Sequence, residues 1–118
     1  MGLDIATLGA QLSKAMLDEL KNDSEKVKGL ALAEGEKLAV ALVRIGELLV
    51  MRHVDGEEAA VLVQVQKDAA ESVLASLAEI SRVVASKAVM LGLRGVAAAV
   101  DAEIGIPILG PLFAIATA

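Results

Sequence analysis

Apolar residues recur at spacings of three and four along most of the chain, which is the pattern of amphipathic helices. The first such segment covers about residues 3–21, with a stripe of Ile5, Leu8, Leu12, Met16 and Leu20. Asn22, followed three residues later by Glu25, predicts a capping box that starts the next helix. The pattern therefore predicts a first helix that buries one face.

The second predicted helix covers about residues 23–53 and is apolar nearly all round between Leu38 and Met51. Such a helix is expected to be buried on most sides. Its interruptions Arg44 and Glu47 are spaced to pair as i, i+3 neighbours. Its interior glycines, each costing roughly 1 kcal/mol relative to alanine, either mark close approach by a neighbouring helix or are merely tolerated; they are Gly29, Gly35 and Gly46.

The third predicted helix follows a capping box of Asp55 and Glu58 and covers residues 57–103 without a proline. At 1.5 Å per residue it would be roughly 70 Å long. Its stripe follows an eleven-residue repeat, typical of a nearly straight helix, and consists of Leu62, Gln66, Ala69, Val73, Leu77, Ile80, Val84, Ala88, Leu91 and Gly95. Two shorter helices cannot cover such a helix, so we expect part of the stripe to contact other chains.

The expected fold is thus all-α, with three helices, one of them very long, followed by a short apolar segment hinged by glycine and proline. The alternative is a break near Gly92 or Gly95, which would make a four-helix bundle with a short fourth helix. The expected division is a helical domain over residues 1–103 and an apolar tail over residues 104–118.

Residues 104–118 carry no charge and contain both prolines and the only aromatic residue of the chain. An apolar surface of this kind marks an interaction site if nothing in the same chain covers it. The residues predicted to contact other copies or a membrane are Val73, Leu77, Ile80, Val84, Leu91, Ile106, Pro107, Ile108, Leu109, Pro111, Leu112 and Phe113.

Composition narrows the possible functions. Apolar residues make up 56% of the chain, almost all of them aliphatic, which suits close packing between helices. A net charge of −5 and a lack of stacking aromatics disfavour nucleic-acid binding. The chain has no cysteine and one histidine, His53, so no thiolate nucleophile or two-histidine metal site is available. We therefore expect neither an enzyme nor a cofactor. The N-terminal segment does not have the pattern of a signal peptide.

The C-terminal segment resembles a pattern near the carboxyl end of bacteriophage tail tape-measure proteins. In that pattern an alanine-rich helix runs into Gly-Ile-Pro, two apolar residues, Gly-Pro and another apolar stretch, and the matching residues here are Gly105, Ile106, Pro107, Ile108, Leu109, Gly110 and Pro111. Tape-measure proteins are much longer than this chain. The resemblance implies a small virion protein of related role, such as an ejected internal protein.

These observations predict a non-enzymatic structural protein that forms a helical homo-oligomer, a component of a phage virion. Its expected partners are copies of itself and other virion proteins. One alternative is a membrane-active, pore-forming protein whose partner is a lipid bilayer, although charges such as Arg44, Glu47 and Arg94 make simple spanning costly. The other alternative is a soluble helical module that binds a partner protein.

Overall fold

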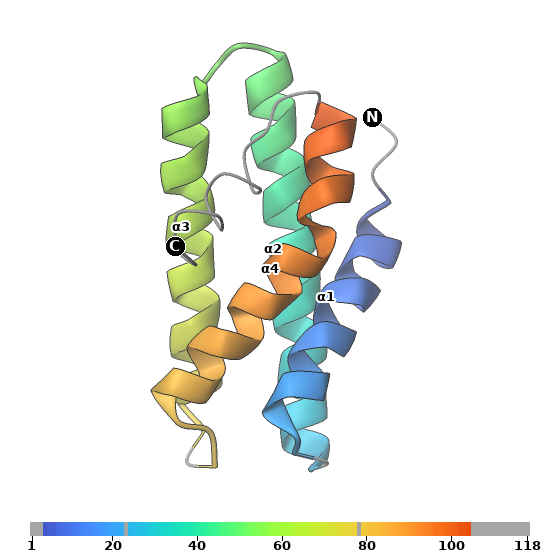
Figure 1. The fold of residues 1–118 in the computed structure, drawn as a ribbon, viewed down its shortest axis with the longest axis vertical. Helices are drawn as coiled ribbons and strands as arrows, with labels where there is room; N and C mark the ends of the chain where they lie inside the picture. The colour runs from blue at the N-terminus through green and yellow to red at the C-terminus, as the bar shows by residue number, and fades with distance from the viewer. Residues whose placement is uncertain (1–3, 23, 78, 105–118) are drawn as a thin grey trace.

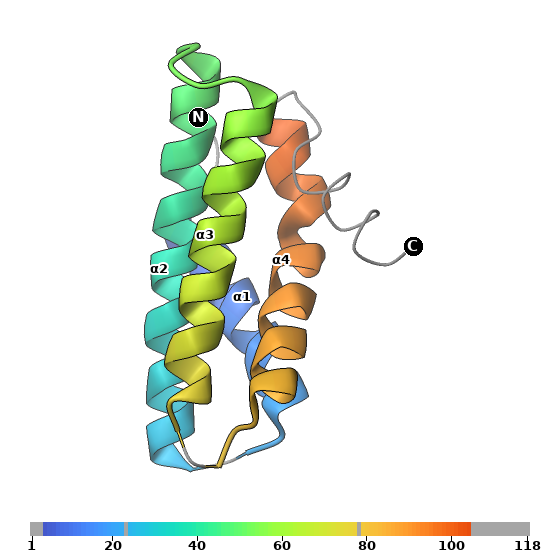
Figure 2. The same ribbon diagram turned by 90° about the vertical axis from the view of Figure 1, so that its left-hand side faces the viewer.

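The computed structural model describes residues 4–22, 24–77 and 79–104, which fold into an all-α bundle (Figure 1). Four helices run alternately down and up the bundle: α1 (Ile5–Leu20), α2 (Glu25–Val50), α3 (Gly56–Ala75) and α4 (Arg82–Ile104). Figure 1 shows α4 crossing obliquely in front of α2, with α1 and α3 on either side. The turned view in Figure 2 shows α3 in front, between α2 and α4.

The predicted three-helix fold with one very long helix over residues 57–103 is wrong, because the chain turns back after Ala75. The backbone N–H groups of Ser76 and Leu77 donate to the carbonyls of Val73 and Leu74 at 3.1 and 3.3 Å. Such bonds from three residues back tighten the last turn of a helix. The Ser76 hydroxyl also donates to the Val73 carbonyl, at 2.6 Å.

The next helix starts at a serine. The Ser81 Oγ atom accepts a hydrogen bond from the backbone N–H of Val84 at 3.2 Å, and the Ser81 carbonyl accepts one from Ala85 at 2.9 Å. A serine in this position accepts a hydrogen bond from one of the first-turn N–H groups that have no partner within the helix. The alternative of a four-helix bundle is right in its number of helices within the described residues. Its break near Gly92 or Gly95 and its short fourth helix are wrong, because both glycines lie inside α4, which has 23 residues.

Packing explains why the chain turns back. The fold places α4 against α1, and it buries the aliphatic side chains of Val89, Leu93, Val96 and Val100. Burial of each of these side chains contributes about 1.5–3 kcal/mol. The four together outweigh the few helical hydrogen bonds lost at the turn, each of which contributes about 0.5–1.5 kcal/mol. A single straight helix would have left these side chains in water.

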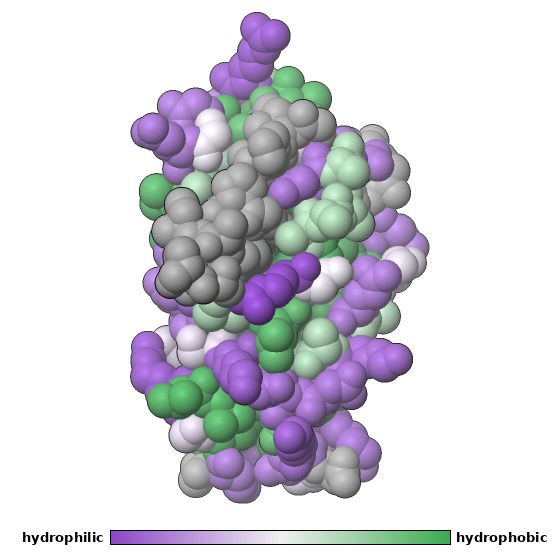
Figure 3. All heavy atoms as spheres, viewed as in Figure 1, coloured by the Kyte–Doolittle hydropathy of each residue, from purple (hydrophilic) through white to green (hydrophobic). Residues whose placement is uncertain are grey.

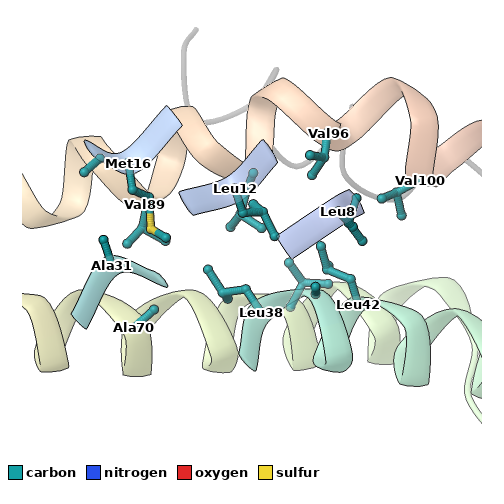
Figure 4. Close-up of a cluster of buried hydrophobic side chains, with 14 of the residues drawn as sticks. Leu8, Leu12, Met16, Ala31, Leu38, Leu42, Ala70, Val89, Val96 and Val100 are labelled. Carbon is teal, nitrogen blue, oxygen red and sulfur yellow. The ribbon is translucent and has the colours of Figure 1, made fainter. Parts of the chain in front are cut away.

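The core is built almost entirely of aliphatic residues from the four helices. Figure 4 shows Leu8, Leu12 and Met16 of α1 between the valines of α4 on one side and the leucines of α2 on the other. Four residues of the predicted first stripe are buried, namely Leu8, Leu12, Met16 and Leu20, whereas Ile5 is exposed. The expectation of an all-α protein with amphipathic helices is confirmed.

One predicted helix start is confirmed and one is wrong. Asp55 and Glu58 form a complete capping box at the start of α3, with hydrogen bonds of 2.8 and 3.0 Å. At the start of α2, however, the capping residue is Ser24, whose Oγ atom accepts from the N–H of Val27. Asn22 instead accepts a hydrogen bond from the N–H of Ser24, so it fixes the turn before the helix.

Candidate assembly surface

Some of the predicted contact residues lie in the core of the bundle, and others lie on its surface. Ile80 is buried with only 5% of its surface exposed, while Val84 is 36% exposed. Val73, Leu77 and Leu91 are half-buried. The remaining predicted contacts lie outside the described residues, and they are Ile106, Pro107, Ile108, Leu109, Pro111, Leu112 and Phe113.

Leu91 belongs to a groove on the outer side of α4. We call this the α4 groove; its lining residues from that helix are Arg82, Val83, Ser86, Lys87, Met90, Leu91 and Arg94, and Glu71 of α3 closes it. The floor is apolar, since Val83, Met90 and Leu91 line it, and Val83 is 78% exposed. Figure 3 shows apolar side chains gathered among hydrophilic ones over the first part of α4.

A partly buried ion pair lies at the inner edge of this groove. The Lys67 Nζ atom lies 2.6 Å from the Glu71 Oε1 atom, which also accepts a hydrogen bond from the Ser86 hydroxyl at 3.2 Å. The two residues are i, i+4 neighbours within α3, a spacing at which side chains of opposite charge meet. Because Glu71 is already paired, its carboxylate holds α3 against α4 and does not neutralise the cations at the rim of the groove.

Three cations surround the groove. Lys87 forms an exposed ion pair with Glu19 of α1 at 3.3 Å. Neither Arg82 nor Arg94 takes part in an ion pair within the described part of the chain. Although the net charge of the protein is −5, the two arginines at the rim of this groove would attract an acidic partner.

A second apolar surface lies on the outer side of α3. Val61 and Val65, one helical turn apart, are 62% and 54% exposed. Acidic residues on the same face surround them, and all are exposed: Glu57, Glu58 and Asp68. Of these, Asp68 accepts a hydrogen bond from the Gln64 amide at 3.0 Å and lies 3.8 Å from the Lys67 Nζ atom. We call the two valines and the three acidic residues the α3 stripe. Helix α3, which carries this stripe, is in front in Figure 2.

The sequence pattern missed Val61, Val65 and Val83, because they lie off the eleven-residue stripe. Valines on the polar side of a predicted helix were the available signal, since a solvated face would not require them. Further large apolar side chains are exposed along α2 and just after it, and they are Leu32, Val40, Val50 and Met51. Leu32 lines a hollow between α1 and α2 together with Ile5 and Glu36, but no basic residue lines that hollow.

The described residues contain no cluster that suggests catalysis. Among them, no group of three or more histidine, aspartate or glutamate side chains is placed to hold a metal ion. His53 is exposed in the turn after α2, where its backbone N–H donates to the Leu48 carbonyl. The surface features that remain are the α4 groove and the α3 stripe.

Comparison of the chain with models of known protein families, with curated proteins and with solved structures found no match in any of the three.

Proposed function

We propose that this protein is a non-enzymatic structural protein that works as a helical homo-oligomer. The observation that carries the proposal is the exposure of large aliphatic side chains on a bundle whose interior is already filled, above all Val83, Val61 and Val65. Single exposed apolar residues are ordinary, but apolar grooves and stripes with charged borders mark protein contacts.

The assembly we propose is a component of a phage virion, either tape-measure-like or an ejected internal protein. This part of the proposal rests on the resemblance of residues 105–111 to the carboxyl-terminal pattern of tape-measure proteins. Its test is to identify the genes next to the coding sequence. Portal, tail or capsid genes alongside would support a virion role, and their absence would count against it.

Self-association is tested directly by sedimentation velocity of the purified protein from micromolar to millimolar concentration. We expect the average mass to rise with concentration above that of the 12.1 kDa chain. A protein that stays monomeric over the whole range would contradict the proposal. That result would leave the soluble partner-binding module as the better interpretation.

One observation favours a second candidate, a membrane-active protein. The segment Arg82–Glu103 of α4 is long enough to cross a bilayer, and an 18-residue window within it has a mean hydropathy of 1.6. However, 44% of that window is buried inside the bundle, so its apolar residues also form part of the core. Flotation with liposomes and release of an entrapped dye distinguish the two candidates, because a purely structural protein neither floats nor releases dye.

A further inference from the structure

The two surfaces defined above are complementary in charge. The α4 groove is apolar with Arg82, Lys87 and Arg94 at its rim. The α3 stripe is apolar with Glu57, Glu58 and Asp68 around it. Extending the proposed self-assembly, on which this inference rests, we propose that the copies join head to tail, with the α3 stripe of one copy docked in the α4 groove of the next.

The spacing of the charges supports this pairing. Glu57 and Asp68 are eleven residues apart on α3, which corresponds to about 16 Å along a helix axis. Arg82 and Arg94 are twelve residues apart on α4, or about 18 Å. A helix laid along the groove can therefore place one carboxylate near each guanidinium at the same time.

The apolar side chains lie between the charges on both surfaces. Val61 and Val65 are located between Glu57 and Asp68, and Met90 and Leu91 between Arg82 and Arg94. When the charges pair at the two ends, the valines of one copy meet the floor of the groove of the other. This gives the usual arrangement of an apolar centre with a polar rim.

The other ways of pairing two copies are unfavourable. Two α4 grooves facing each other would bring four arginines together, in addition to the Lys87 side chains that already pair with Glu19, and two α3 stripes would bring six carboxylates together. Like charges in contact across an interface are costly. Because the stripe and the groove belong to different helices on different sides of the bundle (Figures 1 and 2), each copy can use both. A contact of this kind extends into a ring or a filament.

The first experiment reverses the charges on one surface at a time. Variant A carries Arg82→Glu and Arg94→Glu, and variant B carries Glu57→Lys and Asp68→Lys. Each should raise the dissociation constant of self-association about tenfold or more, since like charges then meet. An equimolar mixture of A and B should associate again, because each stripe then finds a groove of opposite charge.

A matched control separates this contact from the effect of net charge. Lys26→Glu with Lys28→Glu changes the total charge by the same amount as variant A, at exposed positions of α2. This control should associate like the wild type. Circular dichroism of all variants establishes that they are folded. If A and B assemble as the wild type does, the head-to-tail contact is wrong although self-assembly stands. A wild type that never assembles overturns both proposals.

The second experiment uses the absence of cysteine from the chain. A Val61→Cys, Leu91→Cys double variant should give a ladder of disulfide-linked multimers on oxidation, visible on a non-reducing gel. Each single variant should stay a single chain. Dimers from a single variant would reveal a symmetric contact, and a double variant without a ladder would show that the α3 stripe of one copy does not lie in the α4 groove of the next. Either result would overturn the proposal.

Discussion

Gly35 of α2 lies so close to α1 that a Cβ atom at this position would overlap the hydroxyl oxygen of Ser13. The same atom would lie 3.0 Å from the carbonyl oxygen of Gly9. The Ser13 hydroxyl in turn donates a hydrogen bond to the Ala31 carbonyl at 3.3 Å. Small residues on both helices therefore allow α1 and α2 to approach closely at Gly35, whereas Gly29 has no such neighbour and is merely tolerated.

This contact predicts opposite effects for two glycines of the same helix. Gly35→Ala should lower the free energy of unfolding by about 1–3 kcal/mol, because the added methyl group has no room. Gly29 has no atom within 4 Å of the corresponding position, so Gly29→Ala should raise the free energy of unfolding by up to about 1 kcal/mol. Urea denaturation followed by circular dichroism measures both. Equal effects of the two substitutions would contradict the close approach.

The packing of α4 on α1 predicts that alanine substitutions at two nearby leucines lower the free energy of unfolding by very different amounts. Leu93 is fully buried whereas Leu91 lines the exposed groove. Leu93→Ala should therefore cost about 2–5 kcal/mol of unfolding free energy. Leu91→Ala should lower the free energy of unfolding by less than about 1 kcal/mol, because the Leu91 side chain is only half-buried in the folded protein. The long helix expected from the sequence would place Leu91 and not Leu93 on the buried stripe, so denaturation of the two variants distinguishes the two folds.

The start of α4 depends on the hydroxyl of Ser81, which accepts the Val84 N–H. Ser81→Ala should lower the free energy of unfolding by about 0.5–2 kcal/mol, the usual effect of losing a helix cap. Ser72 is exposed within α3, and Ser72→Ala should change stability by no more than about 0.5 kcal/mol. Thermal denaturation of both variants checks the comparison, and a Ser81→Ala protein as stable as the Ser72→Ala protein would argue against the cap.

The cap of α1 predicts a measurable pKa. The Thr7 hydroxyl donates to Asp4 at 2.7 Å and the Ala6 N–H donates at 3.1 Å, and together they hold the pKa of the Asp4 carboxyl below its ordinary value. Thr7→Val should raise this pKa, since the larger cause of its depression is lost. Titration of the Asp4 carboxyl carbon by NMR measures the change in both proteins.

The sign of the pH effect follows from linkage. A carboxyl whose pKa is lower in the folded than in the unfolded protein contributes stability above its unfolded pKa, and this contribution is lost as the pH falls through the folded pKa. The stability difference between wild type and Thr7→Val should therefore shrink in the acid range. A difference that stays constant with pH would show that the Thr7 hydroxyl does not act through the Asp4 charge.

The sequence was sufficient to predict those features that depend only on residues close together in the chain. The stripe from Leu8 to Leu20 predicted α1, and Asp55 with Glu58 predicted the start of α3, because these patterns depend on neighbours in the sequence. The assembly residues were harder to predict, because exposure of Val61 or Val83 depends on which face the rest of the bundle covers.

The amino-acid sequence by itself determined that the protein is all-α, that its helices are amphipathic, and about where α1 and α3 begin. Only the tertiary structure decided that residues 57–103 form two helices. No proline or glycine lies between Ala75 and Arg82, so nothing local forces a break there. The turn forms because the aliphatic face of α4 gains more by packing on α1 than a straight helix gains from continuous hydrogen bonds.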